Sequence, residues 1–214
     1  SFVDRFAGTK TKIGIIQYSD SANNNDFMLY DLSLPGNVEV LKNEIDDIES
    51  PLTGESNMGD GIRRAKYLLK DTSQTLPYAS KHMLVLAGSV PNKWTGQKRN
   101  TEEFKLDDGK AFLLTGDGTV DSDGKSLEYA KAVAEKLKDE SITPIFIDFS
   151  PEDKNIENQL DQVALSSGAE LVSSTGKHLY KADSISMLAG IYDNIYMKTI
   201  FDTSLNSVTF ETIF

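Results

Sequence analysis

The feature that most constrains the fold is a set of strands that are apolar on nearly every residue. Residues 12–18 and 81–87 each form such a run, and residues 142–149 form a further strand. A strand with one wet face would alternate apolar and polar side chains, so these runs predict strands buried on both faces. Such strands need helices above and below the sheet, which favours a parallel α/β arrangement.

Amphipathic helices separate these strands along the chain. Their apolar residues recur at the three- and four-residue spacing of one buried helix face, and they are expected at 38–48, 59–70, 126–138, 155–166 and 184–197. Residues 27–32 are expected to form the second arm of a hairpin at a sheet edge, and 170–172 a short strand. Strands alternating with helices predict the α/β class, with a doubly wound, mostly parallel sheet flanked by helices.

Length and composition limit the classes of function. The chain has 214 residues, 39% of them hydrophobic and 26% charged, which suits one large globular domain. The net charge of −11 would be repelled by a nucleic-acid backbone or an anionic membrane, so neither is an expected partner. The chain has no cysteine, which excludes disulfides and thiolate metal sites. It also has no apolar run of about 18 residues, so no membrane insertion is expected.

A glycine-rich stretch, residues 53–61, leads into the helix expected at 59–70. Ser56 and Asn57 are favourable N-cap residues, and Asp60 favours the first turn through the helix dipole. These groups either cap the helix or hold an ion or a partner's carboxylate. The following Arg63-Arg64 pair is expected on a solvated face of the helix.

Polar residues follow two of the buried strands. Ser19 and Asp20 come after the first, and Ser89 comes after the second. In open α/β sheets ligands bind at the carboxyl ends of the strands, so these residues are candidate contacts.

Residues 93–124 interrupt the alternation of strands and helices and are interpreted as an insertion. Residues 104–114 within it predict a β-hairpin with an Asp-Gly turn. Trp94 is a candidate contact residue because interfaces favour tryptophan, and packing inside the insertion is the alternative. A partial calcium-loop pattern at 121–124 is better explained as a turn and a helix cap.

These segments resemble a von Willebrand factor type A (vWA) domain. The matching pieces are residues 12–20, the helix start at 54–62, and the strand at 83–86 with the loop through residues 91–92. The resemblance covers residues 1–92 and 125–200 and implies a Rossmann-like doubly wound sheet with a protein-binding role. It also implies a divalent cation, often Mg²⁺, whose ligands come from an Asp-x-Ser-x-Ser loop, a Thr at the helix start and an Asp in a Thr-Asp-Gly loop.

The chain departs from the family's cation site. The Asp-x-Ser-x-Ser loop is absent, Ser56 stands at the Thr position, and residues 87–89 (Ala-Gly-Ser) stand in place of Thr-Asp-Gly. One hydroxyl cannot hold an ion that needs several oxygen ligands, so we expect a degenerate site and no certain cofactor. In an alternative register residues 113–118 form the equivalent strand and loop. Ser56 and Asp117 are then the candidate ligands for Mg²⁺ or Ca²⁺.

The family's first strand also has no counterpart ahead of residue 12. It would lie between the strands at 12–18 and 81–87, and an empty slot there costs about 1–3 kcal/mol per unpaired backbone group. We expect residues preceding residue 1 to supply this strand, with another chain or the tail as alternatives. Because the tail alternates, we expect it at an edge. The expected domains are a vWA-like domain at 1–200 and a tail strand at 201–214 that leads out of the domain or pairs with a neighbour.

The expected function is a non-enzymatic, protein-binding module of a cell-surface or secreted protein, in adhesion or a pilus-like assembly. Binding would use the loops at 19–26, 54–60, 88–100 and 115–124. The alternative is an intracellular vWA adaptor subunit of an ATPase-driven metal-insertion or remodelling complex. Neither His82 nor His178 lies near a Ser or an acid pair in the sequence, so no catalytic triad is expected.

Overall fold

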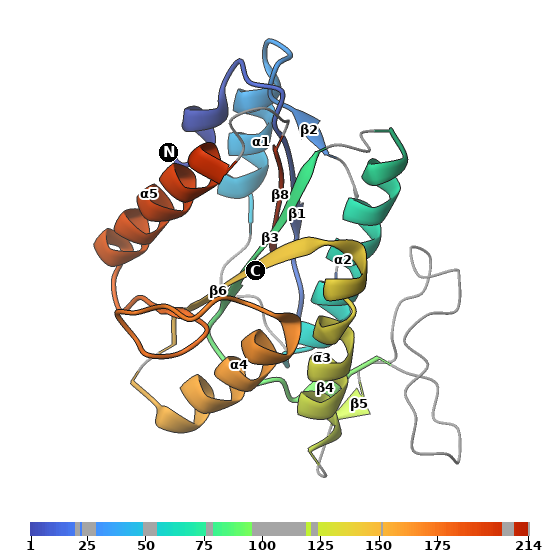
Figure 1. Ribbon diagram of the computed structural model, residues 1–214, viewed down its shortest axis with the longest axis vertical. Coiled ribbons are helices and arrows are strands. Elements are labelled where there is room, and N and C mark those ends of the chain that lie inside the picture. The colour runs from blue at the N-terminus through green and yellow to red at the C-terminus, as the bar shows by residue number, and fades with distance from the viewer. Residues whose placement is uncertain are drawn as a thin grey trace.

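The computed structural model describes residues 1–19, 22, 29–48, 55–75, 79–95, 119–120, 124–150, 152–202 and 208–213. Its centre is a six-stranded sheet with the order β2-β1-β8-β3-β6-β7 (Figure 1). The strands are β1 (Lys12–Ile16), β2 (Tyr30–Asp31), β3 (Ser80–Ala87), β6 (Ile142–Asp148), β7 (Tyr180–Lys181) and β8 (Val208–Ile213). Neighbouring strands are parallel except β1 and β2. A separate antiparallel pair consists of β4 (Lys93–Trp94) and β5 (Thr119–Val120).

Helices cover both faces of the sheet (Figure 1). One face carries α2 (Met58–Thr75), α3 (Lys125–Glu135) and α4 (Lys154–Ser167), and the other carries η1 (Val3–Phe6), α1 (Asn37–Asp46) and α5 (Ile185–Asp202). A short helix, η2 (Lys138–Glu140), precedes β6. Each face of the sheet has its own hydrophobic core. Along β3, Met83 and Val85 belong to the core on the side of α2, α3 and α4, while Leu84 and Leu86 pack in the core on the side of α1 and α5. The continuous apolar run therefore serves two cores at once, and the predicted α/β class is confirmed.

Sequence periodicity located α2 well. All four positions expected to face inward are buried: Ile62, Ala65, Leu68 and Leu69. The Asn57 side-chain oxygen accepts a hydrogen bond from the backbone N–H of Asp60 at 3.2 Å, so Asn57 caps the helix as expected. The helix continues to Thr75, beyond the expected end at residue 70.

Two predictions between residues 170 and 185 are wrong. Residues 170–172 do not form a strand; Val172 makes only an isolated bridge with Lys177, and the paired strand is β7. Ile185, which we expected to face inward at the start of α5, is 80% exposed. The sheet edge takes β7 because its backbone pairs with the end of β6, a relation that local alternation does not encode.

The tail strand β8 lies in the centre of the sheet, so the expectation of an edge position is wrong. It pairs in parallel with β1 on one side and with β3 on the other. It therefore occupies the slot where the sequence predicted a missing strand. Pairing the two facing edges of β1 and β3 satisfies two rows of backbone groups, and this requirement outweighs the alternating pattern of the tail.

Pro144 sits inside β6, where a proline would normally disrupt a ladder. Only the last two residues of β6 pair with β7, and the Ala182 N–H donates to the Asp148 carbonyl at 2.9 Å. Because backbone groups alternate sides along a strand, Pro144 faces the same outer side as Asp148. Its missing N–H therefore falls on an edge rather than in the ladder with β3.

The predicted hairpin at 104–114 lies outside the described residues. In the parts of the chain that the structure covers, none of the helices combines the length and apolar character that crossing a bilayer requires.

Candidate functional site

Three segments meet around the start of α2 at the carboxyl edge of the sheet. The Asn57 N–H donates to the Ser19 carbonyl at 2.7 Å, which joins α2 to the segment after β1. The Ser56 carbonyl accepts from the N–H groups of Asn92 and Lys93 at 3.0 and 3.2 Å, and the Ser56 N–H donates to Asn92 Oδ1 at 2.5 Å. Hydrogen bonds thus hold the segments after β1 and β3 against the N-terminus of α2. We call residues 17–19, 55–60, 87–95 and 148–150 the rim.

Asp60 is the buried anchor of the rim. Its side chain is fully buried and accepts from the Ala22 N–H at 2.7 Å. It also pairs with Arg63 Nη2 at 2.5 Å and with Arg64 Nε at 3.1 Å. The arginines are 5% and 0% exposed, so the expected solvated face of the helix is wrong. Burial alone would lower the pKa of Arg63, but the adjacent Asp60 carboxylate raises it above its ordinary value.

Gly59 lets α3 approach α2 closely behind the rim. A Cβ at this position would lie 2.4 and 2.6 Å from two ring carbons of Tyr129. Trp94 packs in the same core, with its ring centroid 6.5 Å from that of Tyr129, and is only 6% exposed. Its ring makes packing contacts, and a partner could not reach it without displacing neighbouring groups.

The structure brings several of the predicted contact residues together. Ser56 is 6% exposed and Asn57 is fully buried. Ser56 joins the rim through its backbone N–H and carbonyl, whereas Asn57 uses both its backbone and its side chain. The Asn57 side-chain N–H donates to Thr95 Oγ1 at 2.8 Å. Ser19 accepts from Asn57, and Ser89 is exposed on the rim. Asp20 and Asp117 lie outside the described residues.

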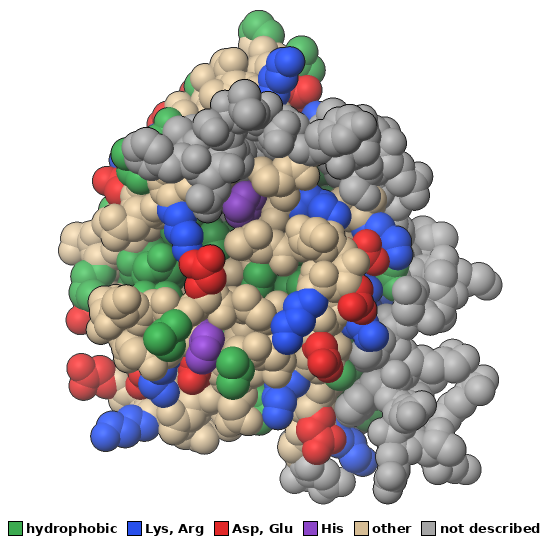
Figure 2. Space-filling model, in the orientation of Figure 1, with side chains coloured by type: hydrophobic (Ala, Val, Ile, Leu, Met, Phe, Trp, Pro, Cys, Tyr) green, Lys and Arg blue, Asp and Glu red, His purple; other side chains and the backbone are tan. Residues whose placement is uncertain are grey.

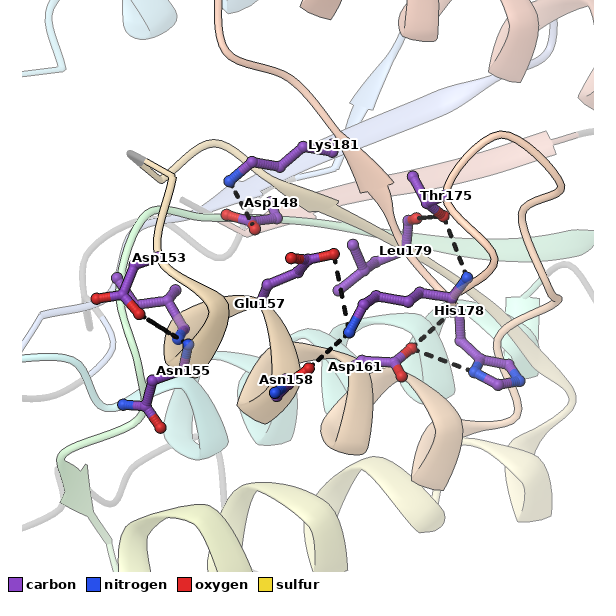
Figure 3. A network of polar contacts seen from close by, with 12 residues as sticks. Asp148, Asp153, Asn155, Glu157, Asn158, Asp161, Thr175, His178, Leu179 and Lys181 are labelled. Carbon is purple, nitrogen blue, oxygen red and sulfur yellow. Dashed lines mark hydrogen bonds and ion pairs between the residues drawn. The ribbon is translucent and has the colours of Figure 1, made fainter.

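An ion pair that the sequence analysis missed lies at the end of β6 (Figure 3). Asp148 is fully buried, and its Oδ2 accepts from Lys181 Nζ at 2.9 Å. Lys181 also donates to the Ser150 carbonyl at 2.9 Å, and Asp148 Oδ1 accepts from the Ser150 N–H at 2.8 Å. The Phe149 N–H donates to the Ala87 carbonyl at 2.8 Å, which joins this group to the end of β3. A carboxylate at the last position of a buried strand was the available signal.

A polar network on α4 holds the loop before β7 in place (Figure 3). The His178 N–H donates to Asp161 Oδ1 at 2.7 Å, and Lys177 Nζ donates to Asn158 Oδ1 at 2.7 Å. This loop leads directly to Lys181. The network therefore helps to position the lysine that neutralises Asp148.

The described residues do not fit a hard divalent cation on their own. Ser56 supplies one buried hydroxyl, which contacts Tyr18, while Asp60 and Asp148 are already paired with cationic side chains. Within the described ranges no three His, Asp or Glu side chains gather into a group that could hold a metal. Six-fold oxygen coordination would need further donors. The Ser56 and Asp117 metal site remains a prediction.

Acidic and basic side chains are interspersed on the face shown in Figure 2, without a field of one sign. Burial raises the pKa of Tyr18 above its ordinary range, and contact with Ser56 opposes that shift in part. The described part of the rim exposes Glu55, Gly88, Ser89 and Phe149, and buried ion pairs lie behind it.

A doubly wound sheet with its polar loops at the carboxyl edge defines the class, and comparison with known proteins gives the family. Residues 1–194 match the von Willebrand factor type A domain, so the chain belongs to this family.

Among solved structures, the chain is similar to a mutant of the PilB minor pilin from Streptococcus sanguinis, with a TM-score of 0.67 and 16% sequence identity. The match covers 94% of this chain and 52% of the pilin chain, so this chain spans about half the length of that structure. At this identity the likeness concerns the fold. A search of curated proteins found no match.

Proposed function

We propose that this chain is a non-enzymatic protein-binding module of a cell-surface or secreted protein, in adhesion or a pilus-like assembly. Its partner would bind at the rim, which joins the carboxyl ends of β1, β3 and β6. The observation that carries the proposal is the set of hydrogen bonds from Ser56 and Asn57 to the segments after β1 and β3. Loops held in this way lose little entropy on binding, which favours recognition of a macromolecule.

Family membership and the chemistry of the rim support this role. Domains of this family mediate protein interactions, and the similar solved structure is a pilin. In the described part of the rim, the carboxylates of Asp60 and Asp148 are bound to cationic side chains and the Ser56 hydroxyl is buried. These groups serve to hold the loops, and none is poised as a free nucleophile or base. Presentation of a rigid surface is the role that such groups suit.

The test is binding of the full chain to an array of purified extracellular-matrix and cell-surface proteins. Ser89 is exposed on the rim, so Ser89→Arg should weaken binding of any captured protein by about tenfold, or about 1.4 kcal/mol. Ser173 is also exposed but lies in the loop before β7, so Ser173→Arg is the matched control and should bind like the wild type. Equal loss in both variants, or co-purification with ATPase subunits in place of array binding, would contradict the proposal.

A further inference from the structure

An apolar cavity opens between the sheet and the helices on the face that carries η1, α1 and α5. Its volume is about 320 Å³, and its floor includes Ile13 and Ile15 of β1 and Leu84 and Leu86 of β3. Side chains of the three helices, which lie on the same side of the sheet in Figure 1, form the walls. Ile15 and Leu86 are only partly buried, although they belong to inner strands of the sheet. The cavity therefore leaves aliphatic side chains of this core in contact with solvent.

Two aromatic rings line one wall of the cavity. Phe2, directly before η1, and Tyr192 of α5 lie with their ring centroids 5.0 Å apart. Leu188 lies about one helical turn before Tyr192 on the same face of α5 and also lines the cavity. A volume of about 320 Å³ with this lining falls in the range of sites that bind the apolar part of a small organic molecule. The face of an aromatic ring also attracts a cation.

The charges at the mouth of the cavity favour a positively charged group. Lys42 and Asp46 are the charged side chains among the lining residues. Lys42 Nζ lies 3.2 Å from Asp4 Oδ1 and 3.1 Å from Glu39 Oε1, so its charge is already compensated. The Ser1 amino group is likewise paired with Asp4 Oδ2 at 2.7 Å. Asp46 is exposed and forms no ion pair with any residue that the structure describes, so its carboxylate is available to a ligand.

We propose that this cavity binds a small organic cation, with an apolar chain or ring in the cavity and an ammonium group at the mouth beside Asp46. Burial of the ligand's apolar part against the sheet and the aromatic wall supplies most of the affinity. The carboxylate of Asp46 selects for the positive charge. None of the lining residues belongs to the rim, so the inference is independent of the proposed function.

The test uses three probes that share one chain and differ in their head group: octylammonium, octanol and octanoate. Each is titrated into the isotopically labelled full chain, below the concentration at which the probe forms micelles, and NMR reports the site and the Kd. Octylammonium should shift the backbone amides of residues 13–15, 84–86 and 188–192. It should also bind at least about fivefold more tightly than octanoate, because Asp46 attracts one head group and repels the other. Equal or tighter binding of octanoate, or shifts confined to other residues, would overturn the proposal.

Two pairs of variants separate the charge from the cavity. Asp46→Asn should weaken octylammonium binding by about two- to fivefold and leave octanol binding unchanged, whereas Asp139→Asn, at an exposed carboxylate of η2, should change neither. Leu188→Trp fills the cavity and should abolish binding of all three probes, whereas Leu165→Trp, at an exposed position of α4, should bind like the wild type.

Octylammonium binding that persists in Leu188→Trp would show that the amine follows the net charge of −11 rather than the cavity, and would refute the proposal. The shift map of the wild type tests the same site without any substitution, so the result does not depend on a variant folding well.

Discussion

Asp60 makes more contacts than a carboxylate in the first turn of a helix needs to interact favourably with the helix dipole. It holds two buried arginines and the backbone of Ala22. Asp60→Asn would leave two buried guanidinium groups without their carboxylate, and should lower the free energy of unfolding by about 3–5 kcal/mol. Urea unfolding measures this. Asp193→Asn removes the exposed partner of Arg5 and should cost less than about 1 kcal/mol. Similar losses in the two variants would refute the anchoring role.

At Gly59 the absence of a Cβ atom allows α3 to pack closely against α2. An added Cβ would overlap the Tyr129 ring, so Gly59→Ala should destabilise the protein by about 1–3 kcal/mol. Gly190 in α5 has open space where a Cβ would lie, and Gly190→Ala should stabilise by up to about 1 kcal/mol through helix propensity. Thermal unfolding of both variants tests the contrast, and an equally stable Gly59→Ala protein would show that α2 and α3 are not in such close contact.

The roles of some single residues could be predicted from the sequence, and those of others could not. The N-cap role of Asn57 follows from local chemistry and was predictable. The burial of Arg63 and Arg64 was not, because it depends on α3 packing against α2, although their spacing from Asp60 is local. The pairing of Asp148 with Lys181 joins residues 33 positions apart, and no local pattern connects them.

At the scale of elements, the packing of Tyr192 on α5 predicts that the stability of the protein depends on pH. Burial raises the pKa of Tyr192 to about 12, and its ring lies 5.0 Å from that of Phe2. An unfolded tyrosine has a pKa of about 10, so the folded state favours the neutral phenol. The resulting stability is fully present below pH 10 and is lost as the pH rises toward 12. The free energy of unfolding of the wild type should fall more steeply over this window than that of Tyr192→Phe, and parallel curves would argue against a buried phenol.

The position of β8 is also an element-scale claim. A proline in a central strand removes a ladder donor and leaves a buried carbonyl unpaired, at a cost of about 1–3 kcal/mol. Thr212 is in register with both Ile15 and Leu84, so Thr212→Pro should destabilise the protein by at least that amount. Thr212→Val keeps the N–H and is the matched control. If denaturant midpoints of the two variants coincided, β8 would not lie inside the sheet.

The elements themselves were largely predictable, and their order in the sheet only partly so. Apolar runs identified β1, β3 and β6 because each is buried on both faces. Alternation placed the tail at an edge, yet the structure pairs it on both sides, since the facing edges of β1 and β3 need a partner. The edge strand β7 was missed because two paired residues leave almost no sequence signature.

For the whole molecule, the central claim is that the rim is the surface that meets a protein partner. The most direct measurement is hydrogen–deuterium exchange of the chain, free and bound to a protein captured from the array. The account predicts slower exchange on binding at residues 17–19, 55–57 and 88–93, with the outer surfaces of α4 and α5 unchanged. Protection confined to α4 or α5, with the rim unaffected, would contradict it.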